Sequence, residues 1–203
     1  PVWNILEDEF EVFLVNAKHI KQVPGRKTDM KDCEWIARLL QYGLLPKSFV
    51  PPRELRELRD LTRHRAKLIQ QKASIANRIQ KVLEDANIKL ASVATDILGA
   101  SGRAMLEAIT AGEDDSEKLA NLARRRLRGK IPELKIALQG RVSAHHRFLL
   151  KLLLRQLKDL ESYIDELNAS ILEYCRPYEQ EVQRLKTMDG IERCIAENII
   201  AEI

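Results

Sequence analysis

The sequence predicts a mainly α-helical protein, and three observations lead to this prediction. Two long runs, residues 53–87 and 142–174, contain neither glycine nor proline, the residues that interrupt helices most strongly. Within both runs, apolar residues recur at the three- and four-residue intervals of one helix face. Charged residues make up 32% of the chain and aromatic residues only 5%, which favours helix-rich surfaces over a β-sandwich. One short stretch, residues 10–15, has the pattern of a strand.

The length and charge of the chain limit the classes of protein to which it can belong. With 203 residues it can form one or two domains with a buried core. A net charge of +4 and an isoelectric point near 9.0 are compatible with a nucleic-acid partner. Three cysteines without Cys-x-x-Cys spacing indicate a reducing compartment and no zinc site. No apolar run approaches the ~18 residues that span a bilayer, so we expect no membrane partner.

The first fifty residues predict a short helix, a strand and a second helix that begins with acids. Residues 1–9 have the apolar spacing of a helix end, and residues 10–15 are apolar on both faces, which suits a strand covered by helices. Residues 17–24 connect this strand to a helix that Thr28 or Asp29 can cap. This layout is expected at the rim of an α/β sheet.

Two carboxylates stand at the start of this second helix. Asp29 and Asp32 are three residues apart, so on a helix they share one face with Cβ atoms about 5–6 Å apart. Carboxylates held this close repel one another, and a hard divalent cation such as Mg²⁺ satisfies both. The alternative is that the pair only favours the helix N-terminus through the macrodipole. The spacing alone leaves both readings open.

The run 53–87 predicts one helix of roughly 50 Å with an apolar seam. Four apolar residues recur every seven positions: Leu61, Leu68, Ile75 and Val82. A second seam contains Leu58 and Ile79 but also Arg65 and Lys72, which are cations at positions normally occupied by apolar side chains. We expect imperfect packing at these two positions, or an anion beside them.

The same helix is strongly basic. Between Arg53 and Lys81 there are nine basic residues and three acidic ones, a local excess of six positive charges. Guanidinium groups match phosphate well, so nucleic-acid contact is one reading. A solvated helix face with local Glu–Arg pairs is the other. The candidate nucleic-acid-binding residues are Lys27, Arg53, Arg56, Arg63, Arg65, Lys67, Lys72 and Arg78.

Residues 88–140 are interrupted by glycines and predict short helices, one of them from Glu117 to about Leu127. A second basic cluster contains Arg124, Arg125, Arg126, Arg128 and Lys130. We favour its interpretation as a solvated helix end over a second phosphate contact. The run 142–174 predicts the second long helix, with apolar residues spaced alternately by three and four. Its partner is the first long helix, folded back antiparallel, or a second copy of the chain.

The segment from Gly25 to Asp32 reads Gly-Arg-Lys-Thr-Asp-Met-Lys-Asp, and it resembles the Lys-Thr-Asp-x-x-Asp-Ala motif of a transposase family. This is the family of DEDD-type insertion-sequence transposases, the one-ten/one-sixteen family. The resemblance continues through Trp35-Ile36-Ala37 and Phe49-Val50-Pro51, and resumes in the segment 130–134 and near the C-terminus. The small Ala of the family motif is Cys33 here.

The resemblance implies a RuvC-like catalytic domain in which four acids bind divalent metal, with Asp29 and Asp32 matching the last two. Residues 1–50 would be the C-terminal part of that domain, with one strand retained. Residues 51–180 would form a coiled-coil domain, a long antiparallel helical hairpin, and residues 181–203 would begin a helix-hairpin-helix-like C-terminal transposase domain. The implied cofactor is Mg²⁺, used for cleavage and joining of DNA strands.

The implied partners are DNA, a guide RNA transcribed from the element, and further copies of the chain through the coiled coil. The location would be the cytoplasm of a prokaryote, at the nucleoid. Because the chain lacks an initiator Met and stops within an apparent helix, we expect an internal fragment. The resemblance implies four acids and a nucleophilic serine, of which this chain matches only two acids, so we expect it to be inactive alone. Two alternatives remain: a non-enzymatic coiled-coil scaffold that binds nucleic acid, and a RuvC-type junction nuclease.

Overall fold

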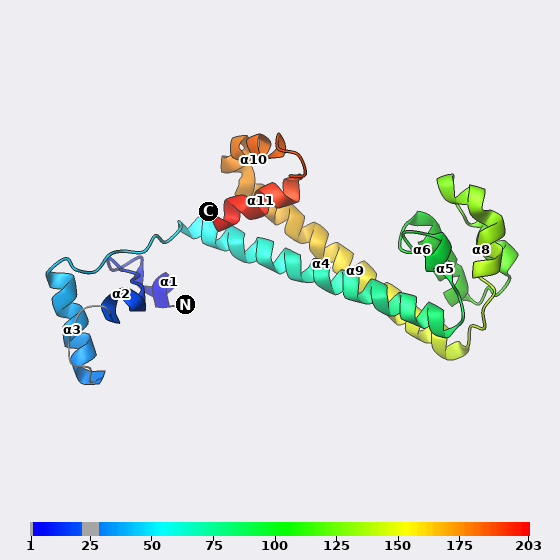
Figure 1. The fold of residues 1–203 in the computed structure, drawn as a ribbon, viewed down its shortest axis with the longest axis horizontal. Coiled ribbons are helices and arrows are strands. Elements are labelled where there is room, and N and C mark those ends of the chain that lie inside the picture. The colour runs from blue at the N-terminus through cyan, green and yellow to red at the C-terminus, as the bar shows by residue number, and fades with distance from the viewer. Residues whose placement is uncertain (1, 22–28) are drawn as a thin grey trace. The chain divides into compact units, whose positions relative to one another are not determined.

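A computed structural model of the protein describes residues 2–21 and 29–203 (Figure 1), and at positions 19, 21 and 29–31 it describes the backbone alone. All regular elements in the described part are helices, so the prediction of a mainly α protein is confirmed. The chain divides into two compact units, Pro1–Arg53 and Glu54–Ile203. None of the described helices is both long enough and apolar enough to cross a membrane.

The first unit contains three helices: α1 (Val2–Leu6), α2 (Ala17–Lys21) and α3 (Asp29–Gln41). Contacts between charged groups join its parts. The Arg53 guanidinium donates hydrogen bonds to Glu7 and Asp8, and Lys47 pairs with Glu11 at 2.7 Å. Leu39 and Leu45 are buried, whereas most other apolar side chains of this unit are at least partly exposed.

The strand predicted for residues 10–15 is wrong. Residues 11–16 have no regular hydrogen-bond ladder, and a single contact of 2.7 Å, from the Ser48 N–H to the Leu14 carbonyl oxygen, links their backbone to the segment 44–52. Apolar alternation indicates which faces a strand could bury, but a strand forms only beside another strand. Among the described residues no other segment provides that edge. Phe10 and Leu14 accordingly remain 60% and 50% exposed.

Two long helices, α4 (Arg53–Asp85) and α9 (Ala144–Cys175), dominate the second unit and lie side by side (Figure 1). Side-chain contacts give their direction: α4 residues 57, 65 and 72 contact α9 residues 174, 168 and 161, respectively. The partner number falls as the α4 number rises, so the helices are antiparallel. Towards the end of α4, Ile79 and Val82 share one apolar core with Leu150 and Leu157.

Short helices cover the end of α4 and the start of α9 (Figure 1). They are α5 (Leu90–Val93), α6 (Ala100–Ala111), α7 (Ser116–Asn121), the 3₁₀ helix η1 (Arg125–Lys130) and α8 (Ile131–Ala137). Gly112, at φ 108°, ends α6, and the Asp115 carboxylate caps α7 by accepting from the Glu117 N–H. The helix predicted from Glu117 to Leu127 is therefore shorter than expected, because α7 ends at Asn121 and η1 follows.

The chain enters and leaves this cap through two adjacent segments. The Lys89 N–H donates to the Ala137 carbonyl oxygen, and the Arg141 N–H donates to the Ala86 carbonyl oxygen, both at 2.8 Å. Gly140 is required here, because a Cβ atom at this position would lie 2.5 Å from the Ala86 carbonyl oxygen.

At the opposite end of the helix pair, α9 stops at Cys175 and the 3₁₀ helix η2 (Arg176–Tyr178), α10 (Glu179–Lys186) and α11 (Arg193–Glu202) follow. Pro177 lies within η2, directly after the end of the long helix. A second apolar cluster forms where α11 contacts α4 and α9, and contains the buried residues Leu58, Ile171, Cys175 and Ala201. Burial raises the pKa of the Cys175 thiol to about 11.

Candidate metal centre and nucleic-acid interface

The first turn of α3 carries the two predicted metal ligands. Asp29 is the first residue of the helix and Asp32 the fourth, so the two positions lie on the same face. The structure describes only the backbone at Asp29, whereas the Asp32 side chain is described and half-buried. No hydrogen bond or ion pair joins the Asp32 carboxylate to another described residue. No described residue would therefore compete with a cation for the Asp32 carboxylate.

The donor chemistry of this turn fits Mg²⁺, which takes carboxylate oxygens as ligands. The two residues would provide only part of a ligand set. Elsewhere in the described ranges, 2–21 and 29–203, no group of three or more His, Cys, Asp or Glu side chains could hold a metal ion. Lys27, the basic residue predicted beside this turn, lies outside the described residues.

Arg65 lies inside the protein, which corrects its assignment as a nucleic-acid contact. It is 3% exposed, and its guanidinium is 2.7 Å from the Glu197 carboxylate of α11. The same group donates hydrogen bonds to the side chains of Asn168 and Asn198 and to the carbonyl oxygen of Cys194. A buried cation needs an anion and full hydrogen bonding, and Arg65 has both within the chain. The anion expected beside this seam position is therefore the Glu197 carboxylate.

Two other predicted nucleic-acid contacts are occupied by acids of the same chain. Arg53 pairs with Glu7 and Asp8, as described above, and these carboxylates raise the pKa of its guanidinium. Arg63 binds the Glu202 carboxylate through two nitrogens, at 2.7 and 2.9 Å. These pairs match the alternative reading of α4 as a helix face with internal charge pairing, although the acids come from other segments.

Lys72 pairs with Glu161 of α9 at 2.8 Å, and Arg103 of α6 binds the same carboxylate. Arg103, and after it Lys72, lower the pKa of Glu161 from 4.5 to about 2. The second cation of the α4 seam is thus neutralised like the first. These contacts fasten α4 to α9 near the middle of the helix pair.

Lys67 and Arg78 are the candidate residues of α4 that keep an exposed side chain without a described acidic partner. Arg78 lines a shallow groove of about 370 Å³ between α4 and α9, together with Asp159 and Tyr163. Arg56 is half-buried and makes interactions of its own. The basic excess of α4 that can reach an external anion is therefore smaller than the sequence count indicates.

Sequence reasoning missed the role of α11 in neutralising α4. Besides Glu197 and Glu202, the backbone of α11 contributes, because the Arg59 guanidinium donates to the carbonyl oxygens of Ala201 and Glu202 at 2.8 and 3.2 Å. An arginine at a helix C-terminus satisfies carbonyl groups that the helix leaves unpaired. The available signal was the pair of acids in a mostly apolar C-terminal segment.

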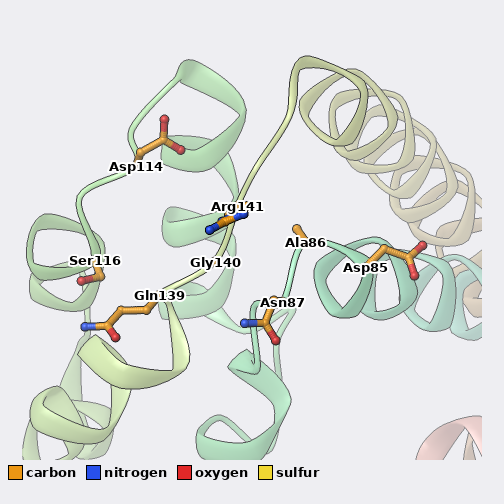
Figure 2. Close-up of a pocket in the computed structure, with 8 residues that line it drawn as sticks. All are labelled: Asp85, Ala86, Asn87, Asp114, Ser116, Gln139, Gly140 and Arg141. Atoms are coloured by element: carbon orange, nitrogen blue, oxygen red, sulfur yellow. The ribbon is translucent and has the colours of Figure 1, made fainter.

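The described part of the chain also contains a polar hollow of about 510 Å³ at the entrance to the helical cap. Figure 2 shows side chains from three segments around it: the end of α4, the loop before α7, and the segment 139–141 that leads to α9. Of its two acids and one arginine, Asp114 is already bound by Arg147. The hollow therefore has no concentration of one charge that would select a ligand.

A carboxylate pair at a helix start and a basic long helix in the same chain are compatible with the class of nucleic-acid-processing proteins. Comparison with known families gives one match. The model of the DEDD transposases of the insertion-sequence one-ten type, described as Transposase, matches residues 1–88. Residues 1–88 are therefore similar to the transposase domain of this family, and the match includes the first turn of α3 and all of α4. Such a domain implies a DNA partner. No curated protein and no solved structure matches the chain.

Proposed function

We propose that the protein acts in metal-dependent cleavage and joining of DNA strands during movement of an insertion sequence. The observation that carries this proposal is the position of Asp29 and Asp32 within the segment that matches the transposase family. The family supplies the reaction class, and the first turn of α3 supplies two acids on one helix face. A helical scaffold without catalytic function would not require this pair.

Asp29 and Asp32 would hold the divalent ion, each through carboxylate oxygens. When bound, Mg²⁺ would polarise the phosphodiester and stabilise charge on its oxygens. The role of the chain is to hold two acids at fixed separation on a helix, so that their mutual repulsion is relieved only by a cation. The half-burial of Asp32 would strengthen this preference, because a partly desolvated carboxylate gains more from a nearby charge.

The proposal extends to three partners. DNA would contact the exposed cations Lys67 and Arg78 through its phosphate groups. The family likeness adds a structured guide RNA that selects the DNA sites. A second copy of the chain would contact the long helices α4 and α9. Light scattering during size-exclusion chromatography would test the last point, and a monomer at all concentrations would contradict it.

The test of the reaction is a pair of variants, Asp29→Asn and Asp32→Asn, made in the protein encoded by the intact gene. Asparagine keeps the size of the side chain and removes the charge. We expect each variant to lower strand transfer at least 100-fold in the presence of Mg²⁺, while the far-UV circular dichroism stays unchanged. Glu34→Gln, on an exposed position of the same helix, is the matched control and should retain activity. Strand transfer at the unmodified rate in both Asp variants would refute the proposal.

A further inference from the structure

The arginines that follow α7 form a cluster that no described acid neutralises. We call Arg124, Arg125, Arg126 and Arg128 the arginine turn. All four side chains are exposed, and no described acid forms an ion pair with any of them. Arg53, Arg63 and Arg65, in contrast, are each paired with a carboxylate. Four unpaired arginines of the second unit therefore lie within a stretch of five residues at this turn.

The backbone of the arginine turn is held in place from both sides. The Arg124 N–H donates to the Ser101 hydroxyl of α6 at 2.9 Å, and the Lys130 ammonium donates to the Val93 carbonyl oxygen at 3.3 Å. Between them, Leu127 packs against the apolar core of the cap. The side chains therefore project from a fixed support, which lowers the entropy lost when they bind a partner.

Local structure does not account for these charges. The sequence favoured a solvated helix end, where the macrodipole stabilises cations. In the structure, α7 ends at Asn121, and the arginines form a separate 3₁₀ helix that leads directly into the start of α8. The end of η1, which carries Arg128, favours cations, whereas the start of α8 that follows directly favours anions, so the two dipoles together do not explain the cluster. Arg125 is also held at a φ of 51°, which is uncommon for a residue other than glycine.

The 3₁₀ geometry brings like charges together. A 3₁₀ helix rises about 2 Å per residue, so the backbones of Arg125 and Arg128 lie about 6 Å apart along its axis. The segment 124–130 contains five basic residues and no acid. The repulsion between these positive charges is lowered by an anion that presents several negative charges in a row. Duplex DNA does so, with one phosphate charge per about 1.7 Å of its axis.

We propose that the arginine turn is a docking surface for the phosphate backbone of duplex DNA. The match of residues 1–88 to a transposase family favours DNA as the polyanion, and this choice rests on the proposed function. The surface itself is independent of the proposed metal centre on α3. Its contacts would position the duplex without reading its sequence. Arginine suits this role, because its planar guanidinium donates two parallel hydrogen bonds to one phosphate.

The experiment measures binding of the 203-residue chain to a labelled duplex DNA of arbitrary sequence, by fluorescence anisotropy at several salt concentrations in EDTA. The test variant replaces all four arginines with glutamine: Arg124→Gln, Arg125→Gln, Arg126→Gln and Arg128→Gln. We expect the affinity to fall at least tenfold at low salt. We also expect the slope of log K against log salt to become shallower by about 3 to 4, since each phosphate contact contributes about 0.9.

The matched control removes four positive charges that are already paired with acids. It combines Lys89→Gln, Lys118→Gln, Lys135→Gln and Arg176→Gln. Its net charge equals that of the test variant, so we expect a change of less than about threefold and an unchanged slope. A second variant with lysine at the four arginine positions should keep most of the binding. If the glutamine variant does not fold, Arg126→Gln with Arg128→Gln replaces it, with half the change in slope.

Three results would overturn the proposal. The first is unchanged DNA binding by the glutamine variant, and the second is an equal loss in the matched control. The third is a larger loss of binding for a duplex RNA of the same sequence than for the DNA. EDTA separates this test from the proposed function, because removal of divalent metal leaves the backbone contact intact. Asp29→Asn and Asp32→Asn should accordingly bind duplex DNA as the unmodified chain does.

Discussion

The buried ion pair between Arg65 and Glu197 gives the sharpest prediction for stability. Their side chains are 4% and 6% exposed, and α4 and α11 meet at this pair. Glu197→Gln keeps the size and one hydrogen-bond acceptor but leaves the Arg65 cation without its anion. Removing one partner of a buried pair costs about 3–5 kcal/mol. For a chain of this length each kcal/mol lowers the melting temperature by about 2–4 °C, so we expect a loss of roughly 6–20 °C.

Thermal and urea unfolding, followed by circular dichroism at 222 nm, would measure this loss. The double variant Arg65→Met with Glu197→Met should be more stable than either single variant, because it removes both buried charges. Glu202→Gln is the control: it breaks the exposed pair with Arg63 and should change the melting temperature much less. The reasoning is refuted if Glu197→Gln melts within 2 °C of the unmodified chain, or if the double variant shows the sum of the two single losses.

Three further predictions concern acid, glycine and thiol chemistry. The pKa of Glu161 is lowered to about 2, so its ion pairs contribute stability above pH 4.5 that is lost as the pH falls towards 2. In urea titrations, Glu161→Gln should therefore be less stable than the unmodified chain by about 1–3 kcal/mol at pH 7, and equally stable near pH 2. Gly102→Ala should destabilise the cap by at least about 2 kcal/mol, because its Cβ would lie 2.1 Å from the Ile97 carbonyl oxygen. Gly129→Ala is the control, because an added Cβ there would have open space around it. Equal unfolding midpoints of the two variants would contradict the prediction for Gly102. A thiol reagent at pH 7 should modify the exposed Cys33 rapidly and the buried Cys175 only after unfolding, because burial raises the pKa of the Cys175 thiol to about 11. Mass spectrometry would measure the modification of each cysteine. Rapid modification of Cys175 in the folded chain would be inconsistent with its burial.

The long helices could be predicted closely from the sequence. The runs 53–87 and 142–174 became α4 (Arg53–Asp85) and α9 (Ala144–Cys175), because helix signals are local: absence of glycine and proline, and apolar residues at regular spacing. The strand at residues 10–15 could not be decided in this way. Its existence depends on a neighbouring strand, which the alternation of apolar residues does not reveal.

The candidate site was predictable only in part, for a related reason. The motif placed Asp29 and Asp32 at a helix start, and α3 begins at Asp29. The periodicity also showed that Arg65 occupies a seam position, which is incompatible with apolar packing. Its partner, Glu197, is 132 residues further along the chain. Pairing over that distance is decided by tertiary structure, so a count of charges along α4 overestimated the surface available to nucleic acid.

The central claim is that the first turn of α3 holds a divalent metal ion, and binding of Mn²⁺ as a substitute for Mg²⁺ tests it most directly. Electron paramagnetic resonance of the protein from the intact gene would count the tightly bound Mn²⁺ without any dependence on DNA or on turnover. The account predicts that Asp29→Asn and Asp32→Asn each weaken Mn²⁺ binding at least tenfold, whereas Glu34→Gln binds as the unmodified protein does. Unchanged Mn²⁺ stoichiometry and affinity in both Asp variants would contradict it.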